Sequence, residues 1–167
     1  MMRRTPAPRG LAASAVALLF IACAVQVPEP PSNAQPVIDP DQAIADFVSL
    51  ANRARLDAGC GTLAWHGDVA AVAQAHSEDM VARDYFHHVD RMGRTPMQRV
   101  QAATIPVNAV AENIAQGHQT GAAVLNGWLD SPDHRRNLLN CQYTHHGVGL
   151  AGSTWTHVLV RLAPRPR

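Results

Sequence analysis

Two histidines and one glutamate are the residues of this sequence whose chemistry best suits a shared site. His88 ends a Tyr-Phe-His-His run, Glu112 precedes an Asn-Ile-Ala segment, and His134 follows a Ser-Pro-Asp segment. Two imidazoles and a carboxylate can hold a divalent metal such as zinc, or pass a proton between them. No two of these residues have the i, i+4 spacing that places two ligands on one face of a metalloprotease helix. The three can form a site only if the fold brings distant segments together.

Neighbouring residues leave alternatives open at this site. His87 could take the place of His88, because the two are adjacent in the chain. His76 lies on the apolar face of a predicted helix, which favours a position in the core or on the floor of a cleft. Asn113 is expected to hold the segment around Glu112 through hydrogen bonds from its side chain to the backbone.

Helical periodicity dominates the first part of the chain after residue 38. Ile44, Phe47, Val48 and Ala51 recur at helical spacing. This helix is expected to begin at Asp39-Pro40, since Asp can cap a helix and Pro suits its first turn, and to end near Gly59. Four more helices are predicted from similar signals: about Asp68 to Asp84, from Thr95-Pro96, from Thr120 through Trp128, and from Ser131-Pro132 through Leu139.

The end of the chain changes to the period of two that is typical of strands. Residues 147–150 and 155–162 are predicted as strands joined by a turn, and a third strand is predicted through 109–115. His145 and His146 adjoin the first of these strands and are interpreted as surface residues. Helices followed by a small antiparallel sheet indicate an α+β domain.

Residues 1–34 are interpreted as a signal peptide and a Pro-rich linker. Three arginines precede a nearly continuous apolar run over 11–27, and prolines follow at 28–31. Basic, then apolar, then small residues is the order of a secretory signal. A membrane anchor is the alternative, although the run is at the short edge of the ~20 apolar residues that a span needs. We expect a cleaved signal and no transmembrane helix in the mature protein.

Three processing sites remain open in this segment. Cleavage after Ala24 or after Ala34 fits the small-residue pattern of signal cleavage. A lipoprotein-type site would instead attach a lipid to Cys23. Beyond the segment we expect one domain over 39–163 and a short tail at 164–167.

Cys60 and Cys141 remain after any of these cuts. Export brings the chain into an oxidising compartment, which favours a disulfide between them, and two free buried thiols are the alternative. A bridge that closes a loop of about 80 residues would stabilise the fold by ~4 kcal/mol in the chain-entropy description.

Composition and charge exclude several classes of protein. The 167 residues include 14 basic and 13 acidic residues and are 47% apolar. Because residues 1–34 hold three arginines and one glutamate, 11 basic and 12 acidic residues remain beyond them. A nucleic-acid-binding module would need a basic face, so we expect no nucleic-acid partner. The apolar content is too high for a disordered chain, and the length suits one domain.

A set of motifs in a fixed order links residues 43–163 to a known family. The motifs are Ala73-Gln74-Ala75-His76 to Met80, Tyr85-Phe86-His87-His88, Gly93-Arg94-Thr95-Pro96 with Arg99, Glu112-Asn113-Ile114-Ala115 with Gly117, Trp128 to Leu138, and Gly147-Val148-Gly149. In this order they resemble the CAP superfamily of cysteine-rich secretory, antigen-five and pathogenesis-related proteins. The bacterial SCP-like extracellular proteins are the branch with the greatest resemblance.

The resemblance implies a three-layer α–β–α sandwich, in which a small antiparallel sheet lies between helices and a central cleft carries two histidines and two acids. His88 matches the first histidine, Glu112 the first acid and His134 the second histidine. At the position of the second acid, three residues after Trp128, this sequence has Ser131. The cleft implied by the resemblance could therefore bind a divalent metal such as zinc, with Ser131 lowering the affinity.

The resemblance also implies a secreted protein, which we interpret as a non-enzymatic extracellular binding module for a small ligand, a lipid or another protein. The sequence contains no Gly-x-Ser-x-Gly motif, and both cysteines of the domain are expected to be structural. A metal-assisted hydrolase of peptides or cell-wall material is the alternative, with His88 and His134 as metal ligands and Glu112 as ligand or general base. Residues 101–110 could line a lipid groove or pack in the core.

Overall fold

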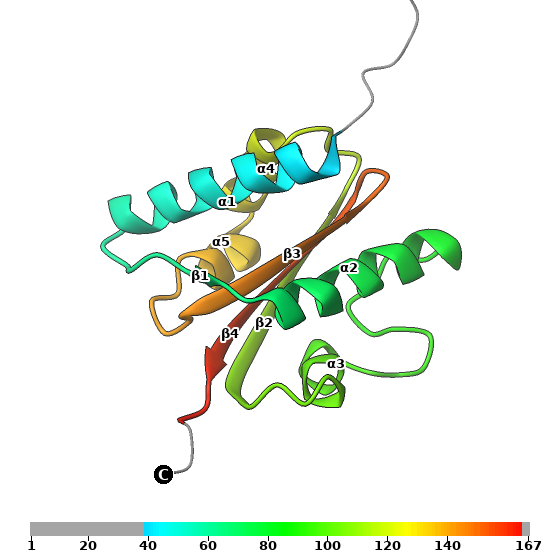
Figure 1. Ribbon diagram of the computed structural model, residues 1–167. Helices are drawn as coiled ribbons and strands as arrows, with labels where there is room; N and C mark the ends of the chain where they lie inside the picture. Colours follow the sequence, from blue (N-terminus) through cyan, green and yellow to red (C-terminus); the bar gives the residue numbers. More distant parts are fainter. Residues whose placement is uncertain (1–38, 165–167) are drawn as a thin grey trace, which may run out of the picture. The chain divides into compact units, whose positions relative to one another are not determined.

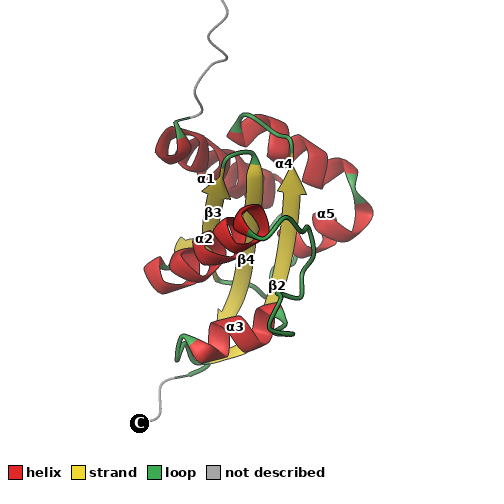
Figure 2. Ribbon diagram, turned by 90° about the vertical axis from the view of Figure 1, so that its right-hand side faces the viewer, coloured by secondary structure: helices red, strands yellow, loops and turns green. Residues whose placement is uncertain are grey.

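The computed structural model describes residues 39–164 and contains a four-stranded sheet between two helical layers (Figure 1). The strand order is β1-β3-β4-β2, with β1 parallel to β3 and the other neighbours antiparallel. Helices α1, α4 and α5 lie on one side of the sheet, and α2 and α3 lie on the other (Figure 2). This arrangement confirms the predicted α+β sandwich. The bounds are α1 Pro40–Asp57, β1 Ala64–Trp65, α2 Gly67–Ala82, α3 Pro96–Ala102, β2 Val107–Gln116, α4 Gly121–Asp130, α5 Pro132–Leu138, β3 His145–Ala151 and β4 Thr154–Leu162.

Side-chain caps account for most of the helix starts. Asp39 accepts hydrogen bonds from the second and third residues of its helix, and Thr120 accepts one from Ala123. Thr95 and Gln98 form a reciprocal capping box at the start of α3. Helix α2 begins at Gly67, one residue before the predicted Asp68. The two-residue strand β1 was not predicted, because so short a segment has no periodicity.

Each face of the sheet packs against its own apolar cluster. On one face, Phe47 of α1 and Trp128 of α4 pack with Trp155 of β4. On the other face, the cluster contains Val69, Ala73, Val100, Ile105, Val158 and Val160. Here α2 lies directly on β3, because Gly147 and Gly149 have no side chain and a Cβ at either position would collide with the backbone of α2. The glycines of β3 therefore set the distance between the sheet and α2.

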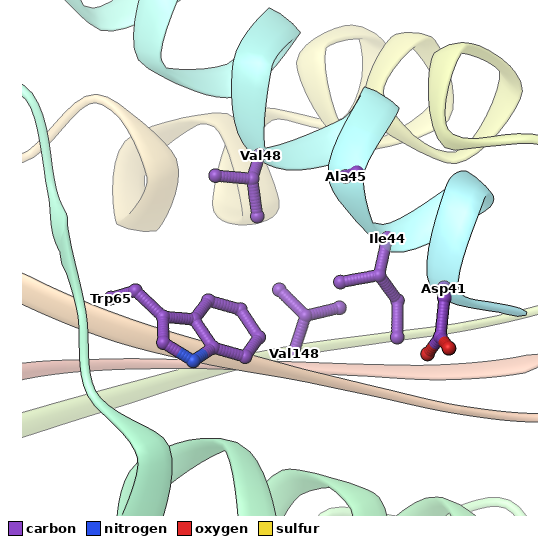
Figure 3. A pocket seen from close by; sticks show the side chains of 6 residues that line it. All are labelled: Asp41, Ile44, Ala45, Val48, Trp65 and Val148. Atoms are coloured by element: carbon purple, nitrogen blue, oxygen red, sulfur yellow. The ribbon is translucent and has the colours of Figure 1, made fainter.

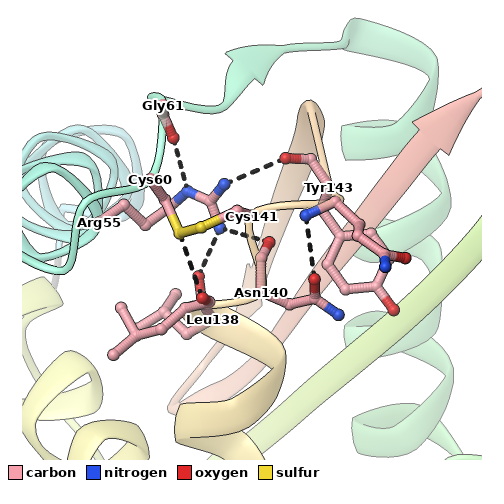
Figure 4. The surroundings of a disulfide bond; sticks show 9 residues. Arg55, Cys60, Gly61, Leu138, Asn140, Cys141 and Tyr143 are labelled. Carbon is pink, nitrogen blue, oxygen red and sulfur yellow. Dashed lines mark hydrogen bonds between the residues drawn. A yellow bond between two sulfur atoms is a disulfide. The ribbon is translucent and has the colours of Figure 1, made fainter.

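The predicted disulfide between Cys60 and Cys141 is present, and it joins the end of α1 to the segment after α5 (Figure 4). The fully buried Arg55 lies beside it and donates hydrogen bonds to four carbonyls, at 2.7–3.1 Å. The four acceptors are the backbone oxygens of Gly61, Leu138, Asn140 and Tyr143. The covalent bridge and one guanidinium group thus fasten the same two segments.

His146 corrects the prediction that it is a surface residue. It is fully buried in β3, and its Nδ1 is 3.0 Å from Nε2 of the buried His157 in β4. His157 in turn stacks on Trp128. The prediction was wrong because β3 begins at His145, two residues earlier than expected, so that strand alternation turns His146 inward with Val148.

The amino-terminal predictions lie outside the described residues. These are the signal segment 1–34, the processing sites and Cys23, together with residues 165–167 of the tail. Between residues 39 and 164, no helix combines the length and apolar character needed to cross a bilayer.

Cys60→Ser is expected to lower the free energy of unfolding by ~2–5 kcal/mol. The bridge joins residues 81 positions apart, and without it the unfolded chain gains conformational entropy. Denaturant titration without reductant measures this effect. Reduced wild-type protein should lose a similar amount. An equally stable Cys60→Ser variant would show that Arg55 alone holds the two segments.

The buried histidine pair is expected to make the fold less stable in acid. Burial lowers the pKa of His146 to about 4 and that of His157 well below its usual value, and the charges of Arg55 and His145 act in the same direction on His146. Between about pH 6.5, the usual histidine pKa in an unfolded chain, and about pH 4, these histidines are protonated in the unfolded chain but not in the folded one. The free energy of unfolding therefore falls by up to ~1.4 kcal/mol for each histidine and each unit by which the pH is lowered.

Denaturant titrations between neutral pH and about pH 4.5 test this linkage. A double variant, His146→Leu with His157→Leu, should show a flatter decline in stability than the wild type. His118→Gln, which replaces a half-buried histidine that does not act on the pair, should keep the wild-type slope. Equal slopes in the double variant and the wild type would refute the assignment.

Candidate functional site

His88 lies in the loop between α2 and α3, and its side chain is 45% exposed. Its Nδ1 is 2.8 Å from Oε1 of Glu112. A carboxylate only accepts hydrogen bonds, so Nδ1 carries the proton and donates it. In the neutral ring this leaves the lone pair on Nε2. Glu112 thereby fixes the tautomer and the orientation of an exposed imidazole.

Glu112 lies on β2 and its side chain is 1% exposed. Its other oxygen, Oε2, accepts a hydrogen bond from Nη2 of Arg99 at 2.6 Å. Nε2 of His76 lies 3.9 Å from Oε1 of Glu112. His76 therefore lies on the floor of the site, which is one of the two positions predicted for it. Both oxygens of Glu112 are engaged, and its charge is balanced by a guanidinium group.

Arg99 holds the site together and was not among the predicted site residues. Besides Glu112, it donates from Nη1 to the carbonyls of His88, at 2.8 Å, and Arg94, at 3.0 Å. Its side chain is 6% exposed although it lies on the seven-residue helix α3. The available signal was its place among the ordered motifs, in which Arg99 accompanies Gly93-Arg94-Thr95-Pro96.

His134 lies on α5, close enough to His88 for the charge of His88 to lower the pKa of His134. Residues Glu112 and Asn113 of the strand β2 point to opposite faces of the sheet. Nδ2 of Asn113 donates to the carbonyl of His134 at 3.0 Å, and Nδ2 of Asn137 donates to Oδ1 of Asn113 at 2.9 Å. Helix α5 is thereby docked on β2 beside Glu112. Within the described residues, no hydrogen bond or ion pair joins the His134 side chain to His88 or Glu112.

Burial and charge keep the imidazoles of His76 and His134 neutral. Burial is the main cause that lowers the pKa of His134, and the neighbouring His88 lowers it further, against the opposing charge of Asp133. The pKa of His76 is also lowered, mainly by burial, although Glu112 acts in the opposite direction. The lowered pKa of His134 favours a neutral imidazole that can accept a hydrogen bond or bind a metal.

The residues fit a three-ligand metal centre poorly in this arrangement. No group of three or more His, Cys, Asp or Glu side chains within residues 39–164 is placed to hold a metal ion. A metal at Glu112 would have to displace Arg99 or His88 from the carboxylate. Ser131 lies between α4 and α5, and its side chain makes no capping hydrogen bond at the start of α5. Metal binding by His88, Glu112 and His134 therefore stays a prediction.

An apolar groove lies elsewhere on the domain, between α1 and the β1–β3 edge of the sheet. Its volume is about 330 Å³, and Ile44 and Val48 point from α1 toward Trp65 and Val148 (Figure 3). No sequence pattern predicted this groove, since its lining comes from three elements. The stretch 101–110 was predicted to line a lipid groove or to pack in the core, and its residues Ile105, Val107 and Val110 join the apolar cluster under α2, as the second alternative expected.

Comparison with known proteins gives consistent matches. The profile of the cysteine-rich secretory protein family (CAP) matches residues 48–160. An uncharacterized membrane protein of Bacillus subtilis, YlbC, is 36% identical over 115 residues, which are 69% of this chain and 33% of that protein. An uncharacterized protein of the same organism, YkwD, is 34% identical over 115 residues, which are 68% of this chain and 45% of that protein. The chain thus spans less than half of the length of either curated relative.

Solved structures match over most of the domain. The crystal structure of an extracellular protein containing a SCP domain from Bacillus anthracis has a TM-score of 0.71 and 36% identity, and the match covers 73% of this chain and 41% of that one. The structure of an outer surface protein from Borrelia burgdorferi has a TM-score of 0.68 at 21% identity, covering 72% of this chain and 93% of that one. The second match supports the fold alone.

Glu112→Gln is expected to lower the free energy of unfolding by ~3–5 kcal/mol, because it leaves the guanidinium group of Arg99 buried without a counter-charge. Adding Arg99→Met should recover part of this loss. Denaturant titration of the two single variants and the double variant measures the coupling. Asp133→Asn, which removes an exposed ion pair with Arg136, serves as the control and should have little effect. Strictly additive effects would contradict the coupling.

Proposed function

This chain belongs to the cysteine-rich secretory protein (CAP) family, and on that premise we propose that it is a secreted, non-enzymatic ligand-binding domain. The Cys60–Cys141 disulfide supports secretion, because such bridges persist in oxidising compartments. The extracellular SCP-domain protein of Bacillus anthracis, at 36% identity, supports the same location. The signal pattern of residues 1–34 agrees with it.

The proposed ligand-contacting group is Nε2 of His88, with His134 beside it. The observation that carries the proposal is the 2.8 Å hydrogen bond from His88 to a glutamate that is itself fully buried. A buried carboxylate cannot reach a ligand, but it can hold an exposed imidazole in one orientation. An oriented imidazole suits recognition by a hydrogen bond or, through the free nitrogen of its neutral form, by a weakly held metal ion.

The ion pair with Arg99 favours binding over catalysis. A carboxylate beside a general-base histidine assists catalysis by stabilising the imidazolium that forms during the reaction, and this assistance is weaker when a cation already balances the carboxylate. Here Arg99 already neutralises Glu112, at 2.6 Å. The alternative function, a metal-assisted hydrolase, would need Glu112 as metal ligand or base, and thus the loss of this ion pair.

Zinc is the probe for the metal hypothesis. We expect weak binding in calorimetric titrations at about pH 7.5, because His88 and His134 supply only two nitrogen ligands and Ser131 supplies no charge. His88→Ala should abolish the binding, and Ser131→Glu should strengthen it by about tenfold or more. Asn126→Glu, which adds the same charge to an exposed position of α4, is the matched control. Equal effects of the two glutamates would remove Ser131 from the site.

Hydrolysis assays separate the two functions. The wild-type protein, with and without zinc, is incubated with casein peptides and with purified cell-wall material. We expect no turnover above that of His88→Ala. Turnover that disappears in His88→Ala but persists in Asn126→Glu would establish the hydrolase in place of the binding domain.

A further inference from the structure

A second, polar chamber lies behind the Glu112 network, between α2, the loop that follows it and α3. Its volume is about 200 Å³, and it is lined by Ala75, His76, Asp79, Asp90, Arg94 and Arg99. A single buried water needs only ~10–15 Å³ of such volume, and pockets for drug-sized ligands measure about 300–1,000 Å³. The chamber therefore has room for more than one water and suits a small ligand.

Two buried side chains of this chamber each have one atom without a hydrogen-bond partner among residues 39–164. These atoms are Nδ1 of His76 and Nε of Arg99, and the two side chains are 0% and 6% exposed. Nε2 of His76 lies 3.1 Å from the carbonyl of His87, so it carries the ring proton, and Nδ1 of the neutral ring is an acceptor. Arg99 Nε–H is a donor. Leaving such groups unsatisfied is costly, because a buried donor or acceptor has lost its hydrogen bond to water without replacing it.

The charges that line the chamber are already balanced by ion pairs. Asp90 pairs with Arg94 at 2.8 Å, and Asp79 pairs with Arg83 at 2.7 Å. Arg99 pairs with Glu112 at 2.6 Å. A charged ligand would have to break one of these pairs, whereas a neutral ligand with several hydrogen-bonding groups would not. The chemistry of the walls thus selects a neutral polar molecule.

We propose that this chamber binds a neutral, polyhydroxylated small molecule of the sugar or polyol class. Its hydroxyl groups meet the two unpartnered atoms, by donating to Nδ1 of His76 and accepting from Nε of Arg99. Further hydroxyls donate to the carboxylates of Asp79 and Asp90. The chamber is distinct from the exposed face of His88 and goes beyond the function proposed there, although Arg99 contributes to both.

Nitrogen-15 NMR of the histidine rings tests the proposal with named probes. D-glucose and glycerol are the neutral probes, and inorganic phosphate and ammonium are the charged ones. At least one neutral probe should give a saturable shift of the His76 Nδ1 signal, and the charged probes should not. The proposal is overturned if neither neutral probe gives a saturable shift, because this is the result expected for a chamber that holds only water. It is also overturned if a charged probe binds in the chamber more tightly than the neutral probes.

Two variants in α2 locate the binding. Ala75→Leu fills the chamber from its wall at a helix position that tolerates leucine, and it should weaken neutral-probe binding at least about tenfold. Ala71→Leu, one turn earlier and also exposed, is the matched control and should bind as the wild type does. Asp79→Asn, which removes a carboxylate acceptor without filling the space, should weaken binding several-fold. Unchanged binding in both Ala75→Leu and Asp79→Asn would place the ligand elsewhere and refute the proposal.

Discussion

The buried ion pair between Arg99 and Glu112 is the interaction on which the site depends. It joins α3 to the strand β2, and the same guanidinium group holds the loop that carries His88 through two backbone carbonyls. A pair this deeply buried gains little net stability over an apolar contact, but losing either partner is costly. Its main effect is therefore to specify one arrangement. Glu112 cannot move toward a ligand without breaking its ion pair with Arg99. The exposed His88 is therefore the group of this network that a ligand can contact.

The rest of the fold supplies a rigid frame for this pair. The Cys60–Cys141 bridge and the four carbonyl contacts of Arg55 fix the far end of α1 to the segment after α5. Asn113 and Asn137 then dock α5 on β2, next to Glu112. A disulfide-stapled frame with a preformed polar site agrees with the secreted domain that we propose, because such bridges persist in oxidising compartments.

Prediction from sequence succeeded where local rules govern the structure. The capping residues Asp39, Thr95 and Thr120 were correctly predicted as helix starts. The ordered motifs predicted the sandwich and a shared site of His88 and Glu112, and these two side chains are in contact. It failed where the outcome depends on distant segments. Arg55 is buried against carbonyls 83–88 positions along the chain, and Arg99 is buried against a glutamate of another element. His146 is buried by a strand that starts earlier than its periodicity suggested. The cause is tertiary hydrogen bonding for the two arginines and the position of a strand end for His146, and local sequence patterns indicate neither.

The central claim is that Arg99 neutralises Glu112, so that Glu112 orients His88 and does not bind ligands itself. A crystal structure of the protein soaked in zinc tests this most directly. The account predicts that Glu112 keeps its contacts with Arg99 and His88, and that any zinc ion lies on the imidazoles of His88 and His134. A structure in which Glu112 has left Arg99 and coordinates zinc at ~2.0–2.2 Å, together with both histidines, would contradict it.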